Sequence, residues 1–301
     1  MIVVVGKQRD DLMEVAAGTE LVFVDSWDGV PLESVEAVIG RIPPDLLVKA
    51  PNLRWVHSPA AGVDAELSPE MLASDVVLTS SVGNGAIPLA EHSMLLMLML
   101  NREVPRWVKA QAEHRWERFT HGELAGLTLG IYGLGHSGLD LARKAEAFHM
   151  RVIGVRRRVG EPSPYVEQVS FEQLLQESDF IVVTAPRTPE TAGRFGAAEF
   201  ARMKASAYFV CISRGGIADD DALLAALRTG QIAGAGLDAH GIEPLPPESA
   251  FWDLPNVIVT PHNGATSTGT ARRGEEIVRE NLRRFLSGQE LVNVVDKLAG
   301  Y

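Results

Sequence analysis

The chain of 301 residues is long enough for two ordinary domains, and a composition of 46% hydrophobic and 22% charged residues is that of a folded protein with a sizeable core. A formal net charge of −11 argues against a broad nucleic-acid surface, so we expect no nucleic-acid partner. The single cysteine, Cys211, excludes a disulfide within the chain and a multi-cysteine metal site, and the apolar run around it predicts a core position.

Neither the N-terminal residues nor the most apolar segment predicts a leader or a membrane span. Residues 1–6 read MIVVVG, which lacks a basic stretch and is too short an apolar run for a signal peptide. The most apolar segment, 94–100, falls well short of the roughly 20 residues that cross a bilayer, and it predicts a buried helix. We therefore expect a cytoplasmic protein with no membrane partner.

Strand-like and helical patterns alternate along the chain. In the first third we expect strands at 2–5, 20–24, 35–39, 54–57 and 76–79, with helices at 8–17 and 44–50. A long helical stretch over 89–115 leads to a second series of strands at 128–132, 151–155, 180–184, 207–212, 232–237 and 257–260. The helices of this series are expected at 137–148, 171–177 and 219–229, the last ending at Gly230, followed by a final helix at 270–286. Apolar strands separated by helices are typical of parallel sheets covered on both faces, so the pattern predicts an α/β fold with two such units.

A glycine-rich turn follows the expected strand at 128–132. It reads GLGHSG and fits G-x-G-x-x-G, a pattern that becomes specific when a strand leads in and an amphipathic helix leads out, as here. The first glycine allows a tight turn, the second lets the backbone approach a pyrophosphate, and the third lets the helix pack on the strand. Free N–H groups at the start of the helix would face the phosphates. The alternative is a plain strand-to-helix turn. We predict a dinucleotide-binding turn formed by Gly133, Leu134, Gly135, His136, Ser137 and Gly138.

Three arginines follow the second strand of this series. A site for NAD usually has Asp or Glu here, which accepts hydrogen bonds from the adenosine ribose. This chain has Arg156, Arg157 and Arg158 instead. Because a guanidinium pairs well with a 2′-phosphate, the arginines favour NADP(H) over NAD(H), with Arg156 and Arg157 as the first candidates for the contact. The alternative is a solvated basic loop.

Titratable or charged residues follow three later strands, and they suit hydride transfer at a carbonyl carbon. These residues are Arg214, Glu243 and His262, and the carboxyl ends of parallel strands share one edge of a sheet. A carbonyl oxygen that gains charge needs a proton donor, and histidine is suited because its pKa lies near neutrality. A carboxylate can hold the imidazole ring, and an arginine can polarise the carbonyl and pair with a substrate carboxylate.

These motifs, in this order, resemble the D-isomer-specific 2-hydroxyacid dehydrogenase family. That family includes formate, D-lactate, D-3-phosphoglycerate and glyoxylate/hydroxypyruvate dehydrogenases or reductases. The similarity covers nearly the whole chain and is strongest over residues 122–266. The segments that carry it are 122–138, 184–191, 213–223, 237–245 and 260–264.

The resemblance implies roles for individual residues. Arg214 would bind and polarise a 2-oxo acid, His262 would be the general acid in reduction and the base in oxidation, and Glu243 would partner His262. Asp238 would lie near the nicotinamide amide. The other cofactor contacts implied are Pro186, Thr191, Ser213 and Gly264. Backbone N–H groups of the loop at 60–64 would hold the substrate carboxylate, although an ordinary strand-to-helix turn is the alternative reading of that loop. The substrate contacts implied are Ala60, Ala61, Gly62, Arg214 and His262.

The resemblance also implies a domain layout and a homodimer. A Rossmann dinucleotide-binding domain at 97–267 would be inserted into a flavodoxin-like substrate domain made of 1–96 and 268–301. A helix carrying Met94, Met97 and Met99 would lie at the dimer interface, the alternative being burial within one chain. Six further histidines lack metal-ligand spacing, so we expect no metal and interpret them as surface or capping groups. They are His92, His114, His121, His136, His149 and His240.

The leading hypothesis is an oxidoreductase that passes a hydride from NADPH, or less readily NADH, to a small 2-oxo acid such as glyoxylate or hydroxypyruvate. The second is a nucleotide-binding regulator that kept the fold and lost catalysis, against which the intact Arg214, Glu243 and His262 argue. A third, a methyltransferase using the glycine-rich turn for S-adenosylmethionine, fits the downstream arginines poorly.

Overall fold

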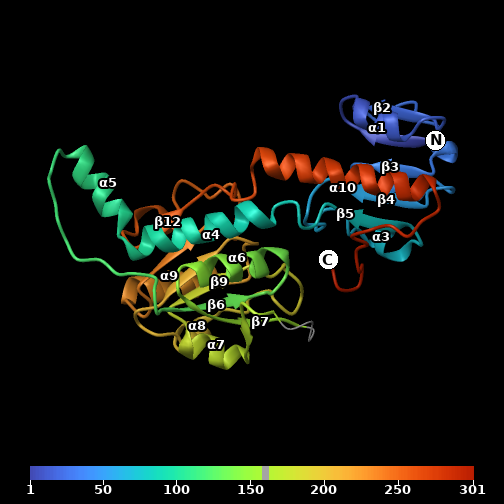
Figure 1. Ribbon diagram of the computed structural model, residues 1–301. Helices are drawn as coiled ribbons and strands as arrows, with labels where there is room; N and C mark the ends of the chain where they lie inside the picture. Colours follow the sequence, from blue (N-terminus) through green and yellow to red (C-terminus); the bar gives the residue numbers. More distant parts are fainter. Residues whose placement is uncertain (158–162) are drawn as a thin grey trace. The chain divides into compact units, whose positions relative to one another are not determined.

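Short runs of apolar residues form two parallel sheets in the computed structural model, which describes residues 1–157 and 163–301 (Figure 1). The chain divides into unit 1, Met1–Gly85 with Ser267–Tyr301, and unit 2, Ala86–Thr266. The sequence placed the first boundary at 96/97, inside helix α4 (Ala86–Asn101). The structure places it before this helix because α4 contributes Met94, Leu96 and Met97 to a core cluster of unit 2.

Unit 1 contains a five-stranded sheet with the order β2-β1-β3-β4-β5, and all its pairs are parallel. The strands are β1 (Ile2–Val5), β2 (Leu21–Val24), β3 (Ala37–Ile39), β4 (Trp55–Ser58) and β5 (Val77–Ser80). Its helices are α1 (Asp10–Val15), α2 (Pro44–Leu47), α3 (Pro69–Ala73) and α10 (Thr268–Leu286), with a 3-10 turn at Leu32–Ser34. Residues of α1 and α10 pack on one face of the sheet and those of α2 and α3 on the other, so this unit has the doubly wound, flavodoxin-like layout.

Unit 2 contains a seven-stranded parallel sheet with the order β12-β11-β10-β9-β6-β7-β8. The strands are β6 (Thr128–Tyr132), β7 (Arg151–Val155), β8 (Glu167–Gln168), β9 (Phe180–Val183), β10 (Tyr208–Cys211), β11 (Gly234–Leu237) and β12 (Val257–Val259). Its helices are α4, α5 (Val104–Ala112), α6 (His136–Ala147), α7 (Phe171–Glu177), α8 (Ala197–Phe200) and α9 (Asp220–Thr229), with a 3-10 turn at Ala250–Asp253. Strand β6 pairs with both β7 and β9, so the order reverses at β6 as it does in a Rossmann fold, where ligands bind beyond the carboxyl ends of the strands.

Alternating residues of the strands in unit 2 face different helices. Phe180 and Val182 join the core cluster that contains α4 and α6, whereas Ile181 and Val183 join the cluster that contains α7, α8 and α9. Helices therefore cover both faces of the sheet, as the near-continuous apolar strands predicted. The predicted C-cap of α9 at Gly230 is confirmed by its φ of 70°, and the predicted core position of Cys211 by its exposure of 4%.

The helical stretch expected over 89–115 is not continuous. It ends at Asn101 and begins again at Val104, because Glu103 takes a left-handed φ of 52° and Pro105 occupies the first turn of α5. Within α4, Met94 and Met97 are buried in the core of unit 2, which favours the burial alternative for these two methionines. No helix of residues 1–157 and 163–301 is long and apolar enough to cross a membrane.

A buried histidine in unit 1 makes the stability of this chain sensitive to acid. His57 on β4 is fully buried, with Nδ1 at 2.8 Å from Thr79 Oγ1 and Nε2 at 3.2 Å from Ser81 Oγ. Burial, with a smaller contribution from the charge of Arg9, lowers the pKa of His57 from 6.5 to about 4. Between these two pH values the unfolded chain binds a proton that the folded chain does not, so the free energy of unfolding rises with pH in this window.

We expect the free energy of unfolding to fall by up to about 3 kcal/mol as the pH is lowered from 6.5 towards 4, since each pKa unit corresponds to about 1.4 kcal/mol. His57→Gln keeps a polar group at the site but does not titrate, so it should lose this part of the pH dependence. Urea denaturation of both proteins at about pH 7 and about pH 4.5 measures the difference. Parallel pH dependence in the two proteins would contradict the assignment.

Candidate active site

The glycine-rich turn joins β6 to α6 in unit 2. Gly133 has a φ of 111°, and a Cβ added there would lie 2.5 Å from the backbone nitrogen of Ala185, which follows β9. A Cβ on Gly138 would press on the Gly133 carbonyl oxygen and lie 3.0 Å from Thr184 Oγ1, so this glycine lets α6 pack closely on the turn. Around Gly135, in contrast, a Cβ would meet only open space. The turn is therefore closed towards the sheet and open on its outer side, as a phosphate-binding turn requires.

The first residues of α6 fit the diphosphate of a dinucleotide. Helix α6 begins at His136, and its first internal hydrogen bond is donated by Leu139 N to Gly135 O, at 2.9 Å. The N–H groups of His136, Ser137 and Gly138 precede that bond and stand at the positive end of the helix dipole. Leu134 differs from the other residues of the turn, because its side chain is buried in the core and could offer a ligand only its backbone.

The predicted 2′-phosphate site lies after β7. Arg156 is partly buried and Arg157 is exposed, whereas Arg158 lies outside the described residues. The pKa of Glu190 is lowered mainly by a hydrogen bond from Thr188 Oγ1, with a smaller contribution from the charge of Arg157. The carboxylate of Glu190 therefore partly offsets the positive charge of Arg157. Arg156 is the stronger candidate to bind a 2′-phosphate.

The loop after β9 holds two further residues expected to contact a cofactor, and their polar groups pair with each other. Thr191 Oγ1 donates to the carbonyl oxygen of Pro186 at 2.7 Å and accepts from the N–H of Thr188, also at 2.7 Å. The hydroxyl of Thr191 thus shapes the loop, and the exposed ring of Pro186 is the surface that this loop offers to a ligand.

Glu243 and His262 are brought together in unit 2 at the carboxyl ends of β11 and β12. Nδ1 of His262 lies 2.9 Å from Oε1 and 2.8 Å from Oε2 of Glu243. Partial burial acts to raise the pKa of Glu243, but hydrogen bonds from the N–H of His240 and the ring of His262 outweigh it and lower the pKa. Glu243 is therefore ionised near neutrality and can only accept, so Nδ1 of His262 carries a hydrogen. Nε2 of His262 is left to exchange a proton with a ligand.

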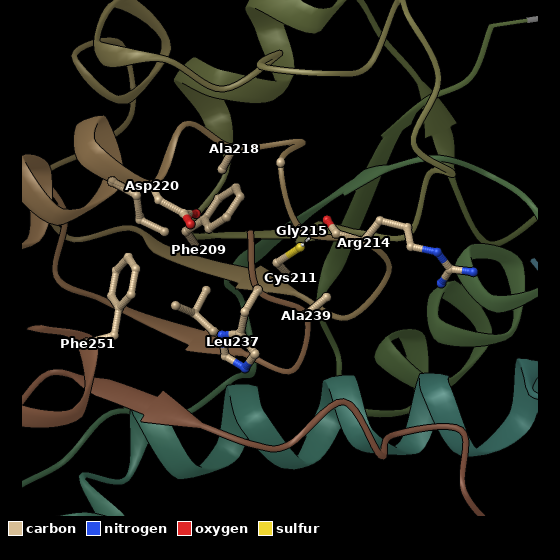
Figure 2. A pocket seen from close by; sticks show the side chains of 12 residues that line it. Phe209, Cys211, Arg214, Gly215, Ala218, Asp220, Leu237, Ala239 and Phe251 are labelled. Carbon is tan, nitrogen blue, oxygen red and sulfur yellow. Dashed lines mark hydrogen bonds between the residues drawn. The ribbon is translucent and has the colours of Figure 1, made fainter. Parts of the chain in front are cut away.

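Arg214 lies in the turn after β10. Its Nη1 donates to the carbonyl oxygen of Ser213 at 2.8 Å, and its own carbonyl accepts from the thiol of Cys211 at 3.4 Å. Figure 2 shows the side chain of Arg214 extending away from Phe209 and Phe251, which line a small cavity behind the turn. With a volume of about 10 Å³, that cavity has room for at most one water molecule and is not a substrate site.

Ser213 supplies a further indication that a ligand belongs at this edge of the sheet. Its Oγ is buried and, within the part of the chain that the structure describes, has no hydrogen-bond partner. Buried polar atoms are nearly always paired, so an unpaired hydroxyl at the carboxyl end of β10 fits a site completed by a bound molecule. Together with the open side of the turn at Gly135, it supports a fit between these residues and a dinucleotide.

Asp238 and Gly264 lie together where β11 and β12 end. Asp238 has no exposed surface, and its carboxylate accepts hydrogen bonds from Thr260 Oγ1, Asn263 N and Gly264 N at 2.6, 3.1 and 3.0 Å. Burial acts to raise the pKa of Asp238, but hydrogen bonds from His92, Thr260 and Gly264 outweigh it and hold the pKa well below its usual value. The ionised carboxylate is thus occupied by its own chain, and a direct contact with a nicotinamide stays a prediction.

His92 on α4 is one of two residues near the site that the sequence analysis did not identify. It was interpreted as a surface or capping group, yet its side chain is only 13% exposed and reaches Thr260 Oγ1 at 3.0 Å. The available signal was a histidine in a helix most of whose residues are apolar. His240 was missed in the same way, since its Nε2 donates to the Thr260 carbonyl oxygen at 2.9 Å. The described residues contain no group of three or more His, Cys, Asp or Glu side chains placed to hold a metal ion.

The loop expected to hold a substrate carboxylate lies in unit 1, after β4. The N–H of Ala60 donates to Ser58 Oγ at 3.3 Å, and the carbonyl oxygen of Ala60 accepts from the N–H of Ser81 at 3.0 Å. Within residues 1–157 and 163–301 the N–H groups of Ala61 and Gly62 make no hydrogen bond. These two amides, rather than that of Ala60, are the available donors of the loop.

Comparison with known proteins places this chain in a family. A family model described as "D-isomer specific 2-hydroxyacid dehydrogenase, NAD binding domain" matches residues 94–264. The chain is 35% identical over 272 residues to a glyoxylate reductase of Korarchaeum cryptofilum, covering 87% of this chain and 82% of that protein. It superposes with a TM-score of 0.84 on the crystal structure of an NADPH-dependent glyoxylate/hydroxypyruvate reductase from Sinorhizobium meliloti in complex with NADP and sulfate. That protein is 33% identical, and the match covers 100% of this chain and 99% of the other.

A D-3-phosphoglycerate dehydrogenase is also similar, over part of its length. The enzyme of Archaeoglobus fulgidus is 31% identical over 296 residues, which is 97% of this chain but 54% of that protein. The chain thus spans about half the length of this relative and most of the length of the glyoxylate reductases. The match to the family model, the identity over most of a full relative and the shared fold lead to one conclusion. The chain belongs to the D-isomer-specific 2-hydroxyacid dehydrogenase family, whose members are NAD(P)-dependent oxidoreductases.

Proposed function

We propose that this protein reduces a small 2-oxo acid, such as glyoxylate or hydroxypyruvate, to the D-2-hydroxy acid, and that it prefers NADPH to NADH. The observation that carries the proposal is the pair of Glu243 and His262, in which a carboxylate holds Nδ1–H and leaves Nε2 to exchange a proton. This pair stands at the same edge of the sheet as the glycine-rich turn and Arg214, where the strands of unit 2 end. The similarity to glyoxylate reductases supports the substrate class.

The roles of the chain's own groups follow from their chemistry. The glycine-rich turn and the residues after β7 would hold a nicotinamide cofactor, which would supply the hydride for reduction of the acid. Protonated His262 donates the proton on Nε2 to the carbonyl oxygen, and Glu243 stabilises the imidazolium until that moment. The guanidinium of Arg214 offsets the negative charge that develops on the oxygen and pairs with the acid's carboxylate. The N–H groups of Ala61 and Gly62 are the proposed second contact to that carboxylate.

The preference for NADPH rests on the side chains after β7. Arg156 and Arg157 replace the acidic residue that a ribose 2′-hydroxyl would need, and a guanidinium is a good partner for a 2′-phosphate. The solved relative from Sinorhizobium meliloti is described as NADPH-dependent and contains NADP, which supports the proposal.

A substrate panel tests the proposed function. Glyoxylate, hydroxypyruvate, pyruvate and phenylpyruvate should be offered to the purified full chain with NADPH and with NADH, and the absorbance of the reduced nicotinamide followed. We expect turnover with the short acids and a higher kcat/KM with NADPH. Binding of NADPH without turnover on any acid would favour a silent regulator, and absence of both binding and turnover would overturn the proposal.

We also infer that the protein is a homodimer in the cytoplasm, joined through the segment of α4 and α5. Large apolar side chains stand exposed there: Leu95 at 48%, Trp107 at 39% and Val108 at 61%. Large apolar side chains exposed in this way are costly in water and favour a surface covered by a second copy. Light scattering should give twice the chain mass of 32.6 kDa, and Leu95→Glu with Val108→Glu should give the monomer. A monomeric wild-type protein would contradict the inference.

A further inference from the structure

A hydrogen-bonded network reaches from helix α4 to the turn that carries His262. His92 Nε2 lies 3.0 Å from Thr260 Oγ1 and 3.4 Å from Asp238 Oδ1, and Thr260 Oγ1 donates to the same carboxylate oxygen at 2.6 Å. Asp238 has no exposed surface and His92 is 13% exposed, so these contacts are shielded from water. The network therefore belongs to the protein's interior, directly behind the candidate active site.

The positions of the hydrogens in this network follow from its acceptors. The pKa of Asp238 is well below its usual value, so its carboxylate can only accept. The hydroxyl hydrogen of Thr260 is used on Asp238, which leaves the lone pairs of that oxygen free to accept. Nε2 of His92 must therefore carry a hydrogen, which it shares between Thr260 Oγ1 and Asp238 Oδ1.

The network holds the backbone on both sides of His262. On one side Thr260 is fastened through its hydroxyl, and on the other the N–H groups of Asn263 and Gly264 donate to Asp238. His262 lies between them with a φ of 50°, a left-handed conformation that is strained for a non-glycine residue and persists only where the surroundings impose it. The hydrogen bonds to Asp238, and the bond from the N–H of His262 to the Thr260 carbonyl oxygen at 3.1 Å, constrain the backbone here.

Gly264 allows this turn to approach the network closely. A Cβ at that position would lie 2.8 Å from Asp238 Oδ2 and 3.0 Å from Cδ2 of His92. The backbone of the turn thus packs directly on both side chains. If the His92 ring or the Asp238 carboxylate shifts, the backbone at Gly264 and Asn263 must shift with it. His262 is the next residue and would move as well.

We propose that His92 and Asp238 are positioning residues that hold His262 in its left-handed conformation and so aim its Nε2. The inference rests on the proposed function for its effect on rate, but the placement of the His262 ring can be measured without any reaction. Glu243 fixes the ring of His262 through Nδ1, and the His92–Asp238 network fixes its backbone. Proton transfer requires both.

The variants His92→Gln and His92→Leu distinguish loss of the hydrogen-bond donor at residue 92 from a change in side-chain size there. Glutamine can place its amide N–H near the position of Nε2, whereas leucine removes the donor and keeps an apolar side chain of useful size. Because a misplacement of about 1 Å can cost about 100-fold in rate, we expect kcat to fall roughly 10- to 100-fold in His92→Leu. His92→Gln should recover most of that loss. The Kd for NADPH should change little in either variant.

Two further variants keep the test valid if His92→Leu is poorly folded. Thr260→Val removes the hydroxyl between His92 and Asp238 without changing α4, and it should lower kcat as His92→Leu does. Ser93→Ala removes another buried hydroxyl of α4, which donates to the Leu89 carbonyl oxygen outside this network. It is the matched control and should leave kcat unchanged.

The decisive readout does not need turnover. In a protein labelled at histidine Cε1, the His262 resonance can be assigned from its loss in His262→Ala. We expect that resonance to shift in His92→Leu and Thr260→Val, and to stay in place in His92→Gln and Ser93→Ala. An unshifted resonance with unchanged kcat in both disruptive variants would overturn the inference. A weaker Kd for NADPH with kcat unchanged would also overturn it, because the network would then face the cofactor. Failure of the wild-type protein to reduce any 2-oxo acid would count against the proposed function alone.

Discussion

Replacing His262 with alanine should lower kcat/KM for 2-oxo acid reduction by about 100- to 10,000-fold, the range that general acid–base catalysis supplies. The variant loses the only group of the Glu243–His262 pair that can give up a proton, and it leaves the ionised Glu243 without its ring partner. Steady-state kinetics at saturating NADPH measure the loss. The Kd for NADPH should stay near the wild-type value, because His262 is proposed to act on the substrate carbonyl.

Two variants show whether the effect belongs to the pair. Glu243→Gln keeps a side chain of the same shape but removes the charge that stabilises the imidazolium, so we expect a smaller loss than in His262→Ala. His149→Asn is the matched control, since His149 is exposed and its φ of 58° is a conformation that asparagine tolerates. Undiminished activity in His262→Ala would remove His262 from the mechanism.

The double variant Arg156→Asp, Arg157→Ala should raise the Kd for NADPH by about 100-fold or more and change the Kd for NADH by much less. Hydrogen bonds between charged groups contribute roughly 1.5–3 kcal/mol each, and the new carboxylate would repel a 2′-phosphate. Since about 1.4 kcal/mol corresponds to tenfold in affinity, the loss of two such contacts would reach the stated size. Fluorescence titration with the two nucleotides measures both constants.

The single variants divide this effect between the two arginines. Because the charge of Arg157 is partly offset by Glu190, Arg156→Ala should account for most of the loss in NADPH affinity and Arg157→Ala for less. Arg228 in the last turn of α9 lies far along the chain from this strand end, and Arg228→Ala serves as a control for removal of a positive charge. Equal weakening of NADPH and NADH binding, or no weakening, would contradict the assignment of these arginines to a 2′-phosphate site.

Sequence reasoning succeeded where a pattern is local and failed where a contact is distant. The turn at residues 133–138 was predictable because strand, glycines and helix are adjacent in the chain, and β6 and α6 flank it as expected. The break between α4 and α5 was missed although Pro105 was visible, because proline is tolerated in the first turn of a helix and the left-handed φ of Glu103 leaves no sequence signal. The short helices α3 and α8 were missed because four or five residues carry too little periodicity.

The sequence by itself determined the two α/β units, the order of the motifs and which charged or titratable residues follow the strands of unit 2, because each depends on residues close together in the chain. Only the tertiary structure decided which groups these residues meet. His92 and Thr260 are 168 residues apart, and the sheet order that brings β11 and β12 beneath α4 is what joins them. Asp238 is likewise buried and hydrogen-bonded to Thr260 and Gly264, which follow the neighbouring strand β12. Hydrogen-bond partners at such separations are set by the packing of helices on the sheet, which a local pattern does not encode.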